Sequence, residues 1–180
     1  MRKLRNEELD RLTIKEFHAS EKTPLTVVLD NVRSLNNIGS VFRTCDGFRV
    51  EKLILCGIST PPPHRDIYKT ALGAEKSVAW EYYKDTVEAV KKLQDSGYHV
   101  AAVEQAENST GLDKFRPPVQ RKLALVFGHE IKGVSQGAVD TCDSCIEIPQ
   151  YGTKHSFNIS VSVGIVLWDI TRKLDPSTRK

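Results

Sequence analysis

Short apolar runs that alternate with helical patterns are the feature of this chain that most restricts its fold. The apolar runs lie at 25–29, 53–55, 78–80, 99–103, 123–127 and 145–148, near the length of buried strands. Helical patterns cover 37–46 before Gly47, 85–95 before Gly97, and 156–173. Strands separated by helices predict βαβ units, and therefore an α/β fold with a mostly parallel sheet and helices on both faces.

Two stretches lie outside this alternation. Residues 1–20 have the pattern of an N-terminal helix with apolar side chains available for docking. These side chains are Leu4, Leu9, Leu12 and Phe17. Residues 60–66 contain three consecutive prolines, which lack backbone donors and predict an extended loop. Long loops that follow strands are frequent positions for functional sites.

Length and composition favour one compact domain. The chain has 180 residues, of which 39% are hydrophobic, enough to build one core and to disfavour intrinsic disorder. We expect a single domain over 1–180, with 1–22 as an N-terminal helical extension. The formal net charge of +3 permits an anionic partner without requiring one.

Cysteine use and segment lengths predict a cytoplasmic protein with reduced thiols. The first ten residues are mostly charged and do not resemble a secretory signal. The longest apolar stretch, 159–167, falls short of the roughly 20 residues that cross a bilayer. Cys142 and Cys145 form a single C-x-x-C pair with no second pair at ligand spacing, so we predict no metal site.

The first polar segment that could carry chemistry is 29–43. A strand leads into a polar turn and a helix, where Asn36 or Asn37 can cap the helix. Gly39 permits close approach of another backbone, and Arg43 lies four residues further on the same helical face. An ordinary helix cap followed by a solvated arginine would give the same pattern.

The second polar segment is 123–135, where an apolar strand enters a loop bounded by Gly128 and Gly133. Open α/β sheets bind ligands at such positions. The spacing imitates half of a phosphate loop, but Val134 replaces the required lysine, and no dinucleotide fingerprint occurs. Glu130 would suit a ligand with cationic character or with hydroxyl or amine donors. A simple strand-to-helix turn with a solvated acid is the alternative.

The third polar segment, 146–161, places Ser156, Asn158 and Ser160 ahead of an apolar helix. These side chains can cap that helix or hold a ligand. His155 beside Ser156 does not indicate a serine hydrolase, because neighbouring residues rarely align for proton transfer and G-x-S-x-G is absent. The helix is apolar on most sides, so it needs cover that a partner subunit would supply.

In order and spacing, the three segments resemble the motifs of the SpoU (TrmH-type) branch of the SPOUT RNA methyltransferases. The resemblance spans about residues 24–170. It implies S-adenosyl-L-methionine as methyl donor, a ribose 2′-hydroxyl of RNA as acceptor, a homodimer, and a C-terminal trefoil knot. tRNA is the favoured substrate, because compact members of this kind often act on it; rRNA remains an alternative.

The resemblance also implies roles for individual residues. The catalytic set would be Asn37, Arg43, Glu130, Ser156 and Asn158. The cofactor-binding set would be Phe127, Gly128, Glu130, Ile148, Ser156, Phe157 and Asn158. Gly39 falls on the first motif and Ser160, by position, on the third. His129, Lys132 and Phe157 depart from the residues that are usual in the family at these places.

Basic side chains outside the apolar runs would form the RNA footprint. The main RNA-binding set would be Arg33, Arg43, Arg65 and Lys69. Further candidates are Arg2, Lys3, Arg5, His64, Arg172, Lys173, Arg179 and Lys180. Arg43 would grip a phosphate and stabilise the developing alkoxide, because a guanidinium keeps its proton too tightly to act as a base. The alternatives are an inactive RNA-binding protein of the same fold and a nucleotide-binding enzyme.

Overall fold

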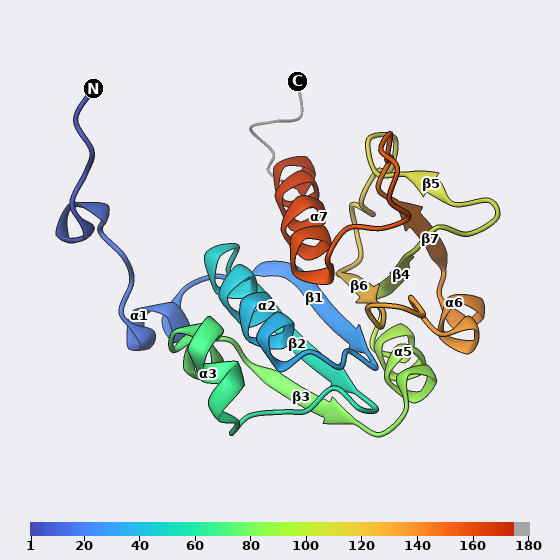
Figure 1. Cartoon of the computed structure of the whole chain (residues 1–180), viewed down its shortest axis with the longest axis horizontal. Helices are drawn as coiled ribbons and strands as arrows, with labels where there is room; N and C mark the ends of the chain where they lie inside the picture. Colours follow the sequence, from blue (N-terminus) through green and yellow to red (C-terminus); the bar gives the residue numbers. More distant parts are fainter. Residues whose placement is uncertain (175–180) are drawn as a thin grey trace.

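A sheet of parallel strands forms the centre of the computed structural model, which describes residues 1–174 (Figure 1). The strands are β1 (Thr23–Asp30), β2 (Val50–Cys56), β3 (Trp80–Tyr83), β4 (His99–Val103), β5 (Thr110–Gly111), β6 (Leu123–Phe127) and β7 (Ser144–Glu147). Their order across the sheet is β3-β2-β1-β6-β4-β7-β5, and every pair is parallel. The α/β prediction is confirmed. Arg179 and Lys180 lie outside the described residues.

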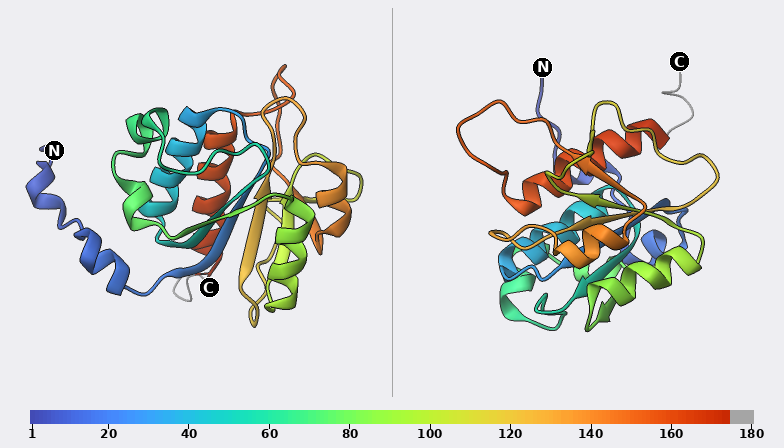
Figure 2. Two further views of the ribbon diagram at one scale, coloured as in Figure 1. Left: turned by 90° about the horizontal axis from the view of Figure 1, so that it is seen from below. Right: turned by 90° about the vertical axis from the view of Figure 1, so that its right-hand side faces the viewer.

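Helices cover both faces of the sheet, as the alternation of patterns predicts (Figure 2). They are α1 (Ile14–Ala19), α2 (Leu35–Gly47), α3 (Arg65–Ala71), α4 (Ala74–Ser77), α5 (Thr86–Asp95), α6 (Gln136–Thr141) and α7 (Ile159–Leu174). One apolar core joins the sheet to α2, α3 and α7, and a second joins it to α5 and α6. Val27 and Val28 on β1 face different cores, because successive strand side chains alternate between faces.

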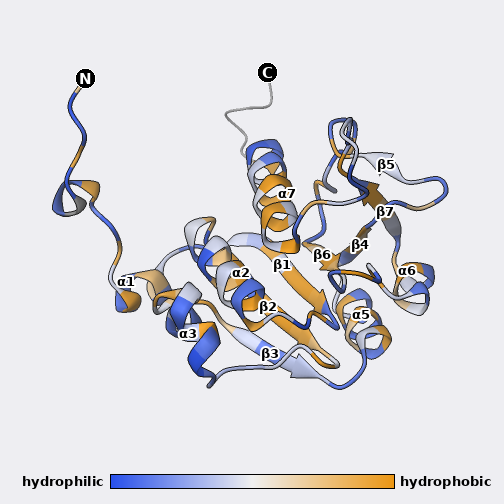
Figure 3. Cartoon of the chain, in the orientation of Figure 1, coloured by the Kyte–Doolittle hydropathy of each residue, from blue (hydrophilic) through white to orange (hydrophobic). Residues whose placement is uncertain are grey.

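The central strands are mostly apolar because parallel strands are buried on both faces (Figure 3). All five residues of β6 are buried. The register pairs Leu29 with Phe127 and Ala102 with Val126, so β1, β4 and β6 end at the same edge of the sheet. The loops that follow these strands therefore emerge side by side.

The first turn of α2 corrects the capping prediction for Asn36 and Asn37. Ser34 is the cap, and its hydroxyl accepts a hydrogen bond from the backbone N–H of Asn37 at 3.3 Å. The serine takes this position because its short side chain reaches back to the third residue of the helix. The amide side chain of Asn37 is thereby free for other contacts. Close approach at Gly39 is confirmed: a Cβ there would lie 2.3 Å from the carbonyl oxygen of Ile67 on α3.

The N-terminal segment is not the single helix predicted over 1–20. A 3-10 turn covers Asn6–Leu9, and α1 begins only after Thr13, which forms a reciprocal capping box with Glu16. The box starts α1, whereas the 3-10 turn has already ended at Asp10, which has φ of +43°. Phe17 docks in the core, whereas Leu4, Leu9 and Leu12 are exposed. The segment reaches away from the sheet (Figure 1).

Other differences from the predictions are local. The strand predicted at 78–80 lies at Trp80–Tyr83 instead, as β3, and the helix predicted at 156–173 begins at Ile159. The proline-containing loop ends at His64, because that residue caps α3. The short elements α3, α4, α6 and β5 lacked a periodic pattern long enough to predict. No helix within residues 1–174 has the length and apolar character needed to cross a membrane.

Candidate active site

The loop after β6 is a tight turn that presents Glu130. The backbone N–H of His129 donates to the carbonyl of Gly133 at 3.0 Å, and the reverse bond measures 2.8 Å. A Cβ on Gly128 would lie 2.0 Å from the carbonyl carbon of Gly133, and Gly133 itself has φ of +67°. Both glycines are required for the turn to close.

The carboxylate of Glu130 joins this turn to the start of α2. Its Oε1 accepts hydrogen bonds from the backbone N–H of Ser34 at 2.8 Å and from Nδ2 of Asn37 at 3.1 Å. Its Oε2 accepts from the backbone N–H of Arg33 at 3.1 Å. Two segments almost a hundred residues apart are therefore fixed to each other by one side chain.

Glu130 is held in its ionised form. Burial is the largest single influence and opposes ionisation, but the backbone donors, including those of Ser34 and Arg33, and the Asn37 amide together lower its pKa below the usual value. A carboxylate in this state accepts hydrogen bonds and does not deliver a proton at neutral pH. Because three donors of the protein contact its carboxylate, Glu130 is not the simple solvated acid of the alternative interpretation.

Asn37 and Asn158 extend the network to the start of α7. Asn158 donates through Nδ2 to Oδ1 of Asn37 at 3.2 Å. Its own Oδ1 accepts from the backbone N–H of Ser160 at 2.9 Å and from the Ser160 hydroxyl at 2.7 Å. The Asn37 amide thus has both ends occupied, with its nitrogen toward Glu130 and its oxygen toward Asn158. The three polar segments of the sequence meet here.

A cavity of about 320 Å³ lies beside this network, within the range typical of small-molecule sites. Its walls come from the ends of β4, β6 and β7 and from the start of α7. The predicted cofactor-binding residues that line it are Phe127, Gly128, Glu130, Ile148, Ser156 and Phe157. Asn158 is not on its wall and joins the site through Asn37 instead.

Arg43 is not brought to this cavity. It lies in a separate groove between α2 and α3 together with Ser40, Thr44 and Lys69. Asn37 and Arg43 are six positions apart on α2, which places them roughly 120° apart around the helix. The exposed Arg43 side chain makes no hydrogen bond or ion pair within residues 1–174.

The other predicted RNA-binding residues are distributed around the site. Arg33 contributes only its backbone N–H to the network, and its side chain is exposed. Arg65 is the exposed first residue of α3. Lys69 forms an ion pair with Asp66 at 2.6 Å. Of these three cations, Lys69 lines the groove with Arg43, and none of the three lines the cavity.

Three residues of the site were missed by the sequence analysis. Ser34 carries the signal of a helix cap three residues before Asn37. Glu104 and Gln105 follow the apolar run of β4, where the carboxyl end of a strand could have marked them.

Cys142 and Cys145 are free thiols, and burial raises the pKa of Cys142 to about 12. Residues 1–174 contain no cluster of side chains suited to a metal ion.

The fold and the site together define an α/β protein whose ligand cavity and carboxylate–amide network lie at the carboxyl ends of parallel strands. Residues 24–168 match the SpoU rRNA Methylase family. The chain belongs to this family, and the resemblance inferred from its three motifs is confirmed.

Known relatives are RNA-modifying proteins. The chain is 29% identical to the 23S rRNA (guanosine-2′-O-)-methyltransferase RlmB of Vibrio parahaemolyticus, over 92% of this chain and 66% of the relative. It is also 29% identical to a putative TrmH family tRNA/rRNA methyltransferase of Staphylococcus aureus, over 89% of this chain and 63% of the relative. The chain therefore spans just under two thirds of these curated proteins. The crystal structure of the A. aeolicus TrmH/SpoU tRNA modifying enzyme superposes with a TM-score of 0.78 at 26% identity, covering 89% and 81% of the two chains.

Proposed function

We propose that this chain is an S-adenosyl-L-methionine-dependent RNA 2′-O-ribose methyltransferase. The observation that carries the proposal is the Glu130–Asn37–Asn158 network at the rim of a ligand-sized cavity in a chain of the SpoU family. The named activities of the relatives support the same reaction class. The whole constellation is retained, which disfavours an RNA-binding protein that has lost catalysis.

The cavity fits the cofactor by its size and by its lining. Apolar side chains of Phe127 and Ile148 suit an adenine ring. Ser156 and Glu130 add polar groups for the remainder of the molecule. When bound, S-adenosyl-L-methionine supplies an electrophilic methyl group on a sulfonium.

The polar residues would orient the ribose hydroxyl and stabilise the negative charge that develops on its oxygen. A hydroxyl is a poor nucleophile at neutral pH, so alignment contributes a large share of the rate. Glu130 fixes the amide of Asn37, and Asn158 fixes its rotation, which leaves a rigid polar surface facing the RNA. Arg43 binds a phosphate through its planar fork and stabilises the ribose oxygen while the hydroxyl proton passes to solvent, because the guanidinium is already protonated.

The homodimer is part of this proposal. Val161 and Trp168 are 48% and 59% exposed on α7 and lie seven residues apart, so they share one apolar stripe. A second copy packed on this stripe would bury it. The separation of Arg43 from the cavity of its own chain favours a site that residues of two copies complete.

The finer features of the proposal follow the family resemblance. We favour tRNA as substrate, with rRNA as the alternative. The contacts of residues 104–122 support the C-terminal trefoil knot. Gln105 donates to the carbonyl of His155, and the carbonyl of Leu112 accepts from Lys173 on α7. One domain over 1–180 with 1–22 as its extension is consistent with a single sheet that joins both cores. Four free cysteines support a cytoplasmic location.

Transfer of labelled methyl groups from S-adenosyl-L-methionine to RNA tests the proposal directly. We expect wild-type protein to label the 2′-oxygen of tRNA or rRNA, and Arg43→Lys to reduce the rate about 10²-fold because it keeps the charge and loses the fork. Arg121→Lys is the matched control, since the hydrogen bonds of that guanidinium within residues 1–174 go to the backbone carbonyls of Gly97 and Tyr98. Cofactor binding without methyl transfer to tRNA or rRNA would favour the inactive RNA-binding protein.

A further inference from the structure

Two consecutive polar residues at the carboxyl end of β4 lie on the wall of the cavity and have no role in the mechanism above. They are Glu104 and Gln105. The backbone N–H of Glu104 donates to the carbonyl of Ile146 on β7 at 3.0 Å, which continues the sheet pairing for one more residue. The two side chains are therefore anchored on the rigid end of a central strand.

The carboxylate of Glu104 holds the loop that follows β6. Its Oε2 accepts a hydrogen bond from the backbone N–H of Val134 at 2.8 Å, and its Oε1 accepts from the backbone N–H of Gln105 at 2.8 Å. The same Oε2 would lie 2.1 Å from a Cβ on Gly133. The carboxylate thus packs directly against the backbone of the turn that presents Glu130.

The amide of Gln105 holds the opposite wall. Its Nε2 donates to the backbone carbonyl of His155 at 2.6 Å. His155 belongs to the segment between β7 and α7, which carries the cavity-lining Ser156 and Phe157. Within the described residues, this is the one hydrogen bond that connects 150–157 to the rest of the chain.

We propose that Glu104 and Gln105 are positioning residues that together set the separation of the two cavity walls. Glu104 fixes the 128–134 turn and Gln105 fixes the 150–157 segment, so one strand end defines both sides of the cofactor site. The inference deepens the proposed function and rests on it for the identity of the ligand. Neither side chain is assigned to the transferred methyl group or to the RNA.

Binding of S-adenosyl-L-methionine to the full-length protein, measured by titration calorimetry, tests the proposal. We expect Glu104→Ala and Gln105→Ala each to raise the Kd for the cofactor about tenfold or more, and the KM for cofactor in parallel, with a smaller change in kcat. Glu104→Gln should recover part of the affinity, because its amide oxygen can still accept from Val134. Equal thermal unfolding midpoints for wild type and the alanine variants would separate this loss of affinity from a general fall in stability.

Matched control variants lie at the other end of the molecule. Gln94→Ala removes an amide that donates to the backbone carbonyl of Thr141 at 2.8 Å, between α5 and α6. Asp143→Ala removes a carboxylate that accepts from the backbone N–H of Val100 at 2.7 Å, at the start of β4. We expect both controls to keep the wild-type Kd. Comparable losses in the controls would overturn the positioning role.

Amide hydrogen exchange without any ligand keeps the two proposals separable. Glu104→Ala should speed exchange at Val134, and Gln105→Ala should speed exchange across 150–157, while neither changes exchange in the core of β1. If wild-type protein binds no S-adenosyl-L-methionine, the proposed function fails and the exchange pattern still decides the positioning role. Unchanged exchange, or unchanged affinity in a wild-type protein that binds the cofactor, would show that the inference is wrong.

Discussion

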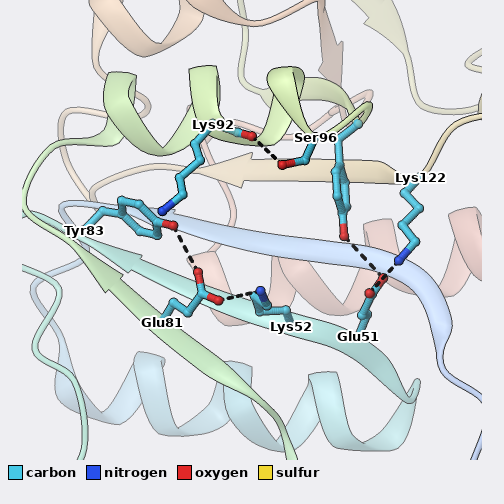
Figure 4. Close-up of polar contacts among 8 residues, drawn as sticks. Glu51, Lys52, Glu81, Tyr83, Lys92, Ser96 and Lys122 are labelled. Atoms are coloured by element: carbon cyan, nitrogen blue, oxygen red, sulfur yellow. Dashed lines mark hydrogen bonds and ion pairs between the residues drawn. The ribbon is translucent and has the colours of Figure 1, made fainter.

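Two carboxylates of this molecule are kept ionised by opposite means. Glu81 on β3 forms an ion pair with Lys52 at 2.5 Å, and Oε2 accepts from the hydroxyl of Tyr83 at 3.1 Å (Figure 4). The bond from Lys52 is the main cause of the lowered pKa of Glu81. Its side chain is 43% exposed, in a setting where ion pairs contribute little to stability.

Among residues 1–174, no cationic side chain pairs with Glu130. Its donors are two backbone N–H groups and the amide of Asn37. Backbone donors at the start of a helix have fixed directions, whereas a lysine can swing to follow its partner. The site therefore positions its carboxylate rather than merely neutralising it. The guanidinium of Arg33, whose backbone is part of the network, is left available for an anionic partner.

Removal of the Glu130 side chain should have the largest effect. Glu130→Ala leaves the half-buried N–H of Ser34, the exposed N–H of Arg33 and the Asn37 amide without their acceptor, so we expect the free energy of unfolding to fall by about 1–3 kcal/mol. Misplacement of Asn37 should lower the rate of methyl transfer about 10²-fold. Chemical denaturation and single-turnover transfer measure the two effects.

Glu81→Ala provides the contrast. The free energy of unfolding should fall by at most about 1 kcal/mol, and methyl transfer should keep its wild-type rate. A cost for Glu81→Ala equal to that for Glu130→Ala would remove the distinction between the two carboxylates.

The dependence of unfolding free energy on pH and salt should distinguish the two carboxylates, with effects smaller than that of Glu130→Ala. Each has a folded pKa below its ordinary value of 4.5, so each stabilises the fold above that pH and loses this contribution as pH falls through the lowered value. The stability advantage of wild type over Glu130→Gln should shrink in this acidic range and persist at about 1 M salt. The corresponding advantage over Glu81→Gln should already be reduced by that salt at neutral pH.

Unfolding free energies measured from about pH 3 to about pH 7, a range that includes the ordinary carboxylate pKa, supply the test. An advantage over Glu130→Gln that disappears with salt would mean that a cation, and not the backbone, holds Glu130.

The strands were predictable because burial on both faces leaves a continuous apolar run. Both β4 and β6 match their predicted bounds. The convergence of the polar segments was also predictable, because parallel strands end at a common edge and the motifs resemble those of one family. The family match and the contact between Asn37 and Glu130 agree with this expectation.

Other features depend on contacts that no local pattern contains. Ser34 displaced Asn36 and Asn37 as the cap, which freed Asn37 for Glu130. The tethers from Glu104 and Gln105 reach residues 30 and 50 positions away. The separation of Arg43 from the cavity depends on how α2 packs against α3. Tertiary packing decides each of these contacts, and no local sequence pattern encodes it.

Changes at Asn158 should affect stability less than removal of Glu130, and they test whether the positioning of Asn37 also depends on Asn158. Asn158→Ala removes one neutral hydrogen bond to Asn37 and a cap on Ser160, so we expect a loss of about 1 kcal/mol in unfolding free energy. Asn158→Asp keeps the acceptor for Ser160 but turns a carboxylate toward Oδ1 of Asn37, which favours rotation of that amide away from Glu130. The aspartate variant should therefore transfer methyl groups more slowly than the alanine variant despite equal or higher stability. Equal rates would mean that Glu130 alone orients Asn37 and that Asn158, which precedes α7, does not contribute.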